Sequence, residues 1–145
     1  MLLTVDLERL DIQPGHRLLD AGCGEGRHCF GSIYRGATVV GLDLDFDSMR
    51  DASKNLRARG EELGRMGAML QGDAFHLPFA DASFDRIICS EVMEHVHDYR
   101  GAVAELFRVA KPGAKVAITI PTATSEHLYL RHGDEYFESP GGHMR

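Results

Sequence analysis

Residues 18–28 read LLDAGCGEGRH, and this stretch decides the fold. Apolar residues around a single acid are typical of a buried strand, and glycines at every second position follow them. Glycine adopts the unusual dihedral angles of a sharp strand-to-helix turn and lets a ligand come close to the backbone. The stretch therefore predicts a strand that enters a ligand-binding turn and continues into a helix.

The turn differs from the loop that binds the pyrophosphate of a dinucleotide. Its G-x-G-x-G spacing, from Gly22 through Gly24 to Gly26, is tighter than the G-x-G-x-x-G of that loop. Asp20 stands at the mouth of the turn, where a carboxylate repels phosphate and attracts an ammonium group. We expect a cationic nucleoside without phosphates, a description that S-adenosylmethionine (SAM) fits.

Length and charge limit the function classes. The chain has 145 residues, about the size of one domain, and a formal net charge of −6. This charge disfavours a nucleic-acid partner, because phosphate contacts need clustered lysine and arginine. The sequence shows no membrane span and no signal peptide. Cys23, Cys29 and Cys89 have neither metal-ligand nor disulfide spacing, so a reducing cytoplasm is expected.

Strand and helix patterns alternate along the chain, which is typical of parallel β-α units. We predict an α/β fold with a doubly wound, mostly parallel sheet. In the helix over 46–59, Phe46, Met49 and Leu56 share one face. A helix over 100–110 is expected to stop at the breaker Lys111-Pro112-Gly113. Strands are expected at 16–21, 37–42, 68–71, 84–89 and 114–120, and helices at 26–34, 46–59 and 100–110.

The last predicted strand is nearly all apolar, as in strands that are covered on both faces of a parallel sheet. After Pro121 the sequence is polar and rich in turn residues, and we find no sixth strand there. We therefore expect residues 1–145 to form a single domain that stops after the fifth strand and lacks further C-terminal strands.

Two more acids follow predicted strands. Asp43 closes the second strand, at the distance from the glycine loop where an acid reaches a ribose hydroxyl pair. A carboxylate can accept hydrogen bonds from both ribose hydroxyls, which favours ribose binding by Asp43. The alternative is that Asp43 only caps the next turn. Asp73 follows the third strand in QGDAFHLPF, residues 71–79, where Gly-Asp is also a plain turn signal.

Together these motifs resemble the class I SAM-dependent methyltransferases, in particular their small-molecule branch of quinone-biosynthesis ("type 11") enzymes. The phrases SFD (83–85), ICSEVMEHV (88–96) and LFRVAKPG (106–113) extend the resemblance from about residue 15 to 121. It implies a Rossmann-like methyltransferase fold and SAM-dependent methylation of an O or N of a small-molecule acceptor.

The resemblance also implies roles for individual residues. Gly22 and Gly24 would line the methionine part of SAM, and Asp20 would lie near its ammonium group. Asp43 would bind the ribose, while Asp73 and the backbone of Ala74 would bind the adenine. The residues expected to contact the cofactor are Asp20, Gly22, Cys23, Gly24, Gly26, Asp43, Leu44, Asp73, Ala74 and Ser90.

The methyl acceptor is expected beside residues 88–96. His95 is the candidate general base, because histidine titrates near neutral pH, and the alternative is a structural histidine. Glu91, Glu94 and His95 form an E-x-x-E-H set that would share one side of a helical turn. With His143 they could hold a divalent cation that orients a catechol-like or diol acceptor.

Two other function classes remain open from the sequence. The first is a nicotinamide-dependent oxidoreductase, which the glycine spacing disfavours. The second is a SAM-binding domain without catalysis. The sequence does not indicate the acceptor or the oligomeric state.

Overall fold

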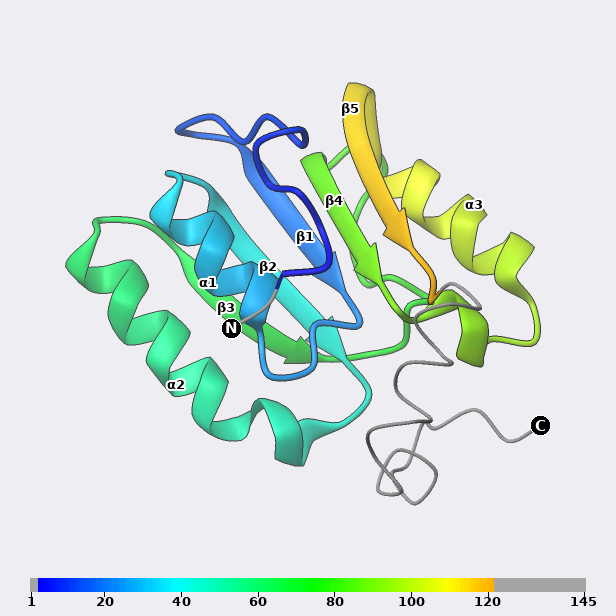
Figure 1. Ribbon diagram of the computed structural model, residues 1–145, viewed down its shortest axis with the longest axis horizontal. Helices are drawn as coiled ribbons and strands as arrows, with labels where there is room; N and C mark the ends of the chain where they lie inside the picture. The colour runs from blue at the N-terminus through cyan, green and yellow to red at the C-terminus, as the bar shows by residue number, and fades with distance from the viewer. Residues whose placement is uncertain (1–2, 122–145) are drawn as a thin grey trace.

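The computed structural model describes residues 3–121 of the chain. One sheet runs through it, with its parallel strands in the order β3-β2-β1-β4-β5 (Figure 1). These strands are β1 (Arg17–Ala21), β2 (Thr38–Asp43), β3 (Gly67–Gln71), β4 (Phe84–Ser90) and β5 (Ala110–Thr119). The predicted doubly wound parallel sheet is confirmed.

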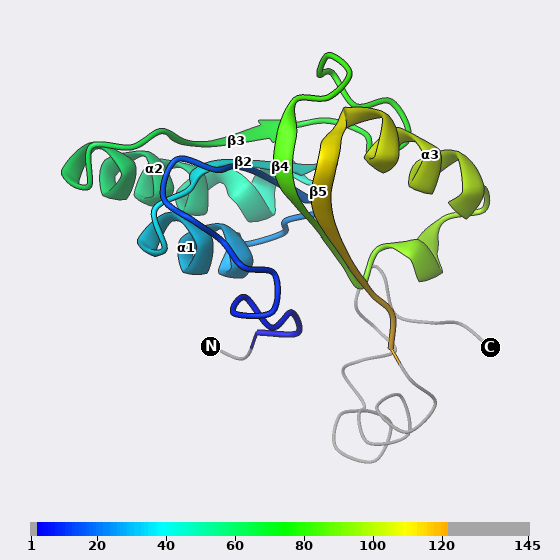
Figure 2. The ribbon, with the colours of Figure 1, turned by 90° about the horizontal axis from the view of Figure 1, so that it is seen from above.

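Helices cover both faces of the sheet, as Figure 2 shows from above. One hydrophobic core lies under α1 (Arg27–Tyr34), α2 (Phe46–Glu62) and the N-terminal segment. The other lies under α3 (Tyr99–Val109), which packs beside β5. Leu18 and Leu19 are both fully buried, one in each core, because successive side chains of a strand point to opposite faces. The central strand is therefore apolar on both sides, as its sequence indicates.

Because the strands are parallel, the turns that follow them all lie at the same end of the sheet. The chain starts at β1, proceeds outward to β3 and then returns to the other side of β1 with β4. The order reverses between β1 and β4, and ligands of open α/β sheets bind at the carboxyl ends of the strands beside such a reversal. The fold thus brings the glycine turn and the ends of β2, β3 and β4 together.

The C-terminal part of the described chain corrects one prediction and confirms another only in part. Helix α3 ends at Val109, and β5 begins at once at Ala110, so Lys111-Pro112-Gly113 lies inside the strand rather than before it. The register between β4 and β5 shifts there, and Gly113 has a φ of +79° that permits this irregularity. The expectation that this strand is covered on both faces holds in part. Ala117 packs against one core and Val116 against the other, but β5 is the outermost strand of the described sheet, and Ile118 is 39% exposed.

Two smaller points also differ from the sequence predictions. Met49 and Leu56 are buried against the sheet as expected, but Phe46, at the first turn of α2, is exposed. A short 3-10 helix, η1 (Met93–His95), follows β4 and was not predicted. The expectation that the sheet lacks further strands after residue 121 falls on residues outside the described part of the chain.

The loop between β3 and β4 is fastened to α3 by a partly buried ionic network. The guanidinium of Arg108 donates to the carbonyl oxygens of Leu77 and Phe79 at 3.0 and 2.8 Å. It also donates to both carboxylate oxygens of Glu105, one of which accepts from the Leu77 N–H at 2.9 Å. The hydrogen bond from Arg108 lowers the pKa of Glu105 to about 2. The network fixes the loop that starts with Asp73.

Glu105→Gln is expected to lower the Tm at pH 7 by roughly 3 °C, because the amide cannot hold both Arg108 and the loop. A carboxylate with a lowered pKa stabilises the fold above its unfolded pKa, and this stabilisation fades as the pH falls toward 2. The difference between variant and wild type should therefore shrink below about pH 4 in thermal melts followed by circular dichroism. Glu62→Gln is the control, because Glu62 forms an exposed surface pair. Equal effects of the two substitutions would contradict the anchoring role of Glu105.

Candidate functional site

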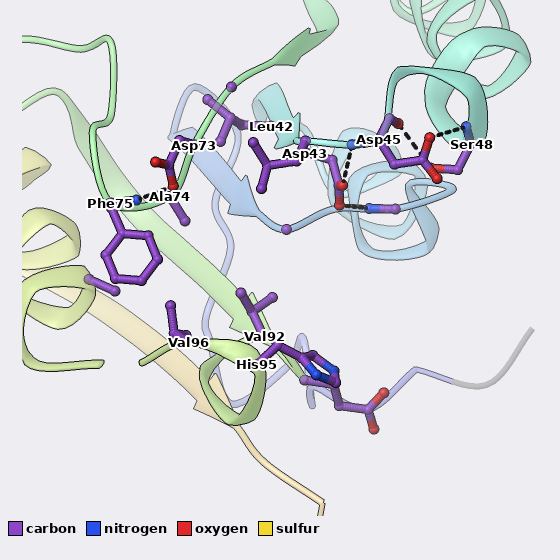
Figure 3. A pocket seen from close by; sticks show the side chains of 16 residues that line it. Leu42, Asp43, Asp45, Ser48, Asp73, Ala74, Phe75, Val92, His95 and Val96 are labelled. Carbon is purple, nitrogen blue, oxygen red and sulfur yellow. Dashed lines mark hydrogen bonds between the residues drawn. The ribbon is translucent and has the colours of Figure 1, made fainter. Parts of the chain in front are cut away.

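A pocket of about 390 Å³ lies at the carboxyl ends of the strands (Figure 3). Each wall comes from a different turn: the glycine turn after β1, the end of β2, the loop after β3 and the segment after β4. The lining residues are Gly22, Gly24, Leu42, Asp43, Leu44, Asp45, Ser48, Gly72, Asp73, Ala74, Phe75, Glu91, Val92, His95, Val96 and Ala102. The pocket stands where the reversal of strand order predicts a ligand.

The glycine turn is held to the end of β2 by its backbone. The N–H groups of Gly22 and Cys23 both donate to the carbonyl oxygen of Leu42, at 2.7 and 3.0 Å. Gly22 has a φ of +77°, and a Cβ on it would lie 2.2 Å from a methyl carbon of Val92. Gly24 has a φ of +49°, and a Cβ on it would meet nothing within 4 Å. The turn therefore requires glycine at Gly22, and at Gly24 it offers backbone beside open space.

Asp43 connects this turn to the start of α2. One carboxylate oxygen accepts from the N–H of Gly24 at 2.8 Å, and the other accepts from the N–H of Asp45 at 3.0 Å. A carboxylate has about four acceptor positions, so these two bonds leave capacity for a ligand. Asp45 in turn caps α2 by accepting from two backbone N–H groups of its first turn. Asp43 is thus both part of the scaffold and part of the pocket wall.

The loop after β3 forms the far wall of the pocket. Asp73 accepts from the N–H of Phe75 at 2.9 Å, and its other oxygen lies 3.3 Å from Nδ1 of His76. This turn sets the backbone of Ala74 and the ring of Phe75 against the pocket (Figure 3). The apolar side chains of Val92 and Val96 line it on the β4 side. The far wall combines an acid, exposed backbone and apolar surface.

Six residues expected to contact a cofactor line this pocket: Gly22, Gly24, Asp43, Leu44, Asp73 and Ala74. The other four, Asp20, Cys23, Gly26 and Ser90, lie outside the lining. Cys23 is buried beside Met49, and Gly26 caps α1 in the left-handed conformation. The hydroxyl of Ser90 forms hydrogen bonds with the hydroxyls of Thr4 and Thr119. Cys23, Gly26 and Ser90 thus make contacts within the scaffold and do not line the pocket.

Asp20 lies within β1 and is only 1% exposed, so it is not at the mouth of the turn. Its Oδ2 accepts from the Cys29 thiol at 3.4 Å, while Oδ1 has no hydrogen-bond partner among residues 3–121. Burial raises the pKa of Asp20 to about 7, partly offset by the thiol and by the charge of Arg27. Asp20 is thus a buried acid that does not line the pocket.

The segment after β4 corrects the geometry of the E-x-x-E-H set. Glu91 does not share a helical turn with Glu94 and His95, because it precedes η1 and has a φ of +57°. Its carboxylate instead pairs with Arg27, at 3.3 Å from Nη2. Within the described residues no three His, Cys, Asp or Glu side chains form a group that could hold a metal ion. The fourth predicted ligand, His143, lies outside the described residues.

His95 lines the pocket and is partly exposed. Its Nε2 lies 3.9 Å from Oε1 of Glu94, whose other oxygen is buried without a hydrogen-bond partner among the described residues. The ring is therefore close to the Glu94 carboxylate, and it also lines the pocket, where Figure 3 shows it. Such a position is open to a substrate and suits a proton acceptor.

The sequence analysis missed half of the lining residues: Leu42, Asp45, Ser48, Gly72, Phe75, Val92, Val96 and Ala102. Leu42, Asp45 and Gly72 stand within two residues of a predicted contact, Asp43 or Asp73. Phe75 immediately follows the predicted adenine residues, so its position was a usable signal. Val92, Val96 and Ala102 are apolar residues around η1 and α3, and no sequence pattern separates a pocket wall from a core face there.

Comparison with known proteins agrees with this geometry. A family model described as a methyltransferase domain matches residues 19–118. The chain belongs to this methyltransferase family. It is 41% identical over 112 residues to the methyltransferase GfsG of Streptomyces halstedii, a match that covers 77% of this chain and 40% of that protein. It is 36% identical over 109 residues to a demethylmenaquinone methyltransferase of Thermobifida fusca, covering 75% of this chain and 45% of that protein.

A solved structure supports the fold. A SAM-dependent methyltransferase of Methanosarcina mazei superposes with a TM-score of 0.71 and 25% identity, over 94% of this chain and 68% of that one. The chain spans less than half the length of the two curated relatives. Within residues 3–121 no helix is long and apolar enough to cross a membrane.

Asp20→Asn tests the burial of the acid. An acid whose folded pKa is raised costs stability as the pH rises from its unfolded pKa toward its folded pKa of about 7. The neutral amide removes this cost, so the variant should gain stability over wild type by about 3 kcal/mol more at about pH 8 than at about pH 5. Urea unfolding of ligand-free protein at both pH values measures the difference. A gain that does not change with pH would show that Asp20 is not buried as a titrating acid.

Proposed function

We propose that this domain is a SAM-dependent methyltransferase that methylates an oxygen or nitrogen of a small molecule. One observation carries the proposal: the pocket at the reversal of strand order is lined by Asp43, Asp45, Asp73 and Glu91, and by no lysine or arginine of the described residues. A phosphate-bearing cofactor would meet four carboxylates there, whereas a cationic nucleoside would be attracted. Membership of the methyltransferase family and the names of the relatives support the same proposal.

Different lining residues would bind the ribose, the adenine and the methionine part of SAM. Asp43 would accept the two ribose hydroxyls with the acceptor capacity that its backbone bonds leave. Asp73 and the backbone of Ala74 would bind the adenine amino group and a ring nitrogen, beside the ring of Phe75. The open space beside Gly24 would receive the methionine part. Leu44, which lines the pocket, would also contact the cofactor, and we propose Cys23, Gly26 and Ser90 only as supports around these contacts.

When bound, SAM supplies an electrophilic methyl group on a sulfonium. The protein then aligns the acceptor in line with that methyl group and excludes water, which provides much of the rate. Val92, Val96 and Phe75 give the pocket an apolar wall for this purpose. His95 would take the proton of a phenol, hydroxyl or protonated amine, with Glu94 beside it.

The remaining assignments are proposals of the same kind. We propose a small-molecule acceptor, which the names of the relatives support, and the net charge of −6 disfavours nucleic acid. The three cysteines are free and buried, which fits the reducing cytoplasm that we propose as the location. We propose that residues 1–145 contribute a single SAM-binding domain.

Asp43→Ala is expected to weaken SAM binding at least about tenfold, roughly the loss of two charge-assisted hydrogen bonds to the ribose. Isothermal titration calorimetry measures the Kd directly. Asp43→Asn keeps one acceptor for the Gly24 N–H and separates loop support from ribose binding. Its Kd for SAM should therefore lie between those of the wild type and the alanine variant. Asp51→Ala, on the exposed face of α2, is the control. Unchanged affinity in the alanine variant would contradict the ribose role.

His95→Gln is expected to lower kcat about 100-fold with a hydroxyl acceptor, because the amide cannot take up the proton. SAM affinity should change less than about twofold. The assay follows transfer of radiolabelled methyl from SAM to a panel of phenols, catechols and small amines. His16→Gln is the control, since His16 directly precedes β1 and so lies at the amino end of that strand, whereas the pocket lies at the carboxyl ends. If the His95→Gln protein binds SAM and methylates its acceptor as fast as wild type, His95 is not the base.

A further inference from the structure

Three sulfur-containing side chains, those of Cys23, Cys29 and Met49, lie together in the core under α1 and α2. The Sγ of Cys23 is 3.8 Å from the Sδ of Met49, which belongs to α2. A Cβ on Gly41 would lie 2.8 Å from the sulfur of Cys23 and 2.9 Å from that of Cys29. Glycine at this position of β2 therefore leaves the space in which the two thiols converge, one from the glycine turn and one from α1.

A buried acid lies next to these thiols. Oδ2 of Asp20 accepts from the Cys29 thiol at 3.4 Å, and Oδ1 has no hydrogen-bond partner among residues 3–121. An unpaired buried oxygen of this kind costs free energy and calls for a bound proton or ion nearby. Burial raises the pKa of Asp20 to about 7, so that this acid takes up a proton readily near neutral pH. Asp20 can thus accept the proton of the Cys29 thiol.

The sulfur atoms determine which ligand fits. Thiolate and thioether sulfurs are soft ligands, which favour Cu(I) over hard cations such as Mg²⁺. Zn²⁺ also binds thiolates but needs four ligands, and within residues 3–121 no three His, Cys, Asp or Glu side chains come together to hold an ion. Metal–sulfur bonds of about 2.3 Å in a trigonal arrangement place the sulfurs roughly 4 Å apart. The distance between the sulfurs of Cys23 and Met49 is close to this value.

We propose that Cys23, Cys29 and Met49 form a binding site for one Cu(I) ion. Without the ion, the neighbouring Cys23 thiol and burial hold the pKa of Cys29 well above its usual value, so the site contains neutral thiols. A coordinated thiol is deprotonated, so Cu⁺ displaces both thiol protons. One proton passes to the Asp20 carboxylate and the other leaves to solvent. Two thiolates and Cu⁺ then carry the single negative charge that the carboxylate carried before, and the oxidation state of copper does not change.

The proposed copper site is separate from the cofactor pocket. None of the three sulfur side chains lines the pocket, although Cys23 stands between two lining residues, Gly22 and Gly24. The spacing of the cysteines along the chain did not predict the site, because its third ligand comes from α2. Copper binding can be measured without SAM, so the result does not depend on the proposed function.

Anaerobic titration with Cu(I) against the chelator bathocuproine disulfonate tests the proposal. The absorbance of the copper–chelator complex gives the stoichiometry and the Kd of the protein. Wild type is expected to bind about one equivalent, and Cys23→Ala or Cys29→Ala to raise the Kd at least about 100-fold through loss of a thiolate. Met49→Leu, which conserves volume, should raise it about tenfold. Cys89→Ala is the control, with a change below about twofold, because Cys89 is buried in the other core.

Proton release tests the role of Asp20. At about pH 8 the wild type should release about one proton to solvent for each Cu(I), measured with an indicator dye in weak buffer. Asp20→Asn should release about two, because the amide cannot take up the thiol proton. Equal release from both proteins would overturn the role of Asp20 as the proton acceptor.

Three results would overturn the copper site. They are binding of much less than one equivalent by wild type, unchanged affinity in the double variant Cys23→Ala/Cys29→Ala, and displacement of the Cu(I) by a tenfold excess of Zn²⁺. Circular dichroism melts show whether each variant folds. If a cysteine variant does not fold, X-ray absorption of copper-loaded wild type decides. Coordination by sulfur alone at about 2.3 Å supports the site, and nitrogen or oxygen ligands overturn it.

Discussion

The site depends on the attachment of the glycine turn to the end of β2. Two N–H groups of the turn share the Leu42 carbonyl oxygen, and a third, that of Gly24, donates to the Asp43 carboxylate. These bonds satisfy backbone donors that a sharp turn would otherwise leave unpaired. They also require a short acid at the end of β2, next to the position where a nucleoside ribose would lie. One set of contacts therefore shapes the turn and supplies a ligand group.

The electrostatics of the site follow from where its acids lie. Asp43, Asp45, Asp73 and Glu91 border the pocket, while Asp20 lies behind the turn in the apolar interior. The bordering carboxylates disfavour phosphate, and the buried one binds a proton more readily because burial raises its pKa. Among the described residues, one arginine forms an ion pair with a lining residue. It is Arg27, which pairs with Glu91 and does not itself line the pocket. The lining of the pocket is thus acidic, and one cation, Arg27, pairs with its Glu91 from outside the lining.

Much of the fold could be predicted from the sequence, because its signals are local. The glycine turn, the alternation of strands and helices, and the acids after β2 and β3 all depend on spacing along the chain. The exposure of Asp20 was predicted wrongly, because the sequence pattern of an acid next to a glycine turn is the same whether its side chain faces the ligand or the core. Glu91 was misplaced because a spacing of three and four residues indicates a shared face only where the chain is helical, and Glu91 precedes the helix. The Arg27–Glu91 pair joins residues 64 positions apart, a distance that no local pattern spans.

The central claim is that the pocket accepts a cationic or neutral adenosine ligand and rejects one that carries pyrophosphate. Calorimetric titration of the wild-type protein with SAM and, separately, with NAD⁺ and NADH measures this selectivity most directly. The account predicts saturable binding of SAM at micromolar concentration and no detectable heat from either dinucleotide. Tighter binding of a dinucleotide than of SAM would contradict it.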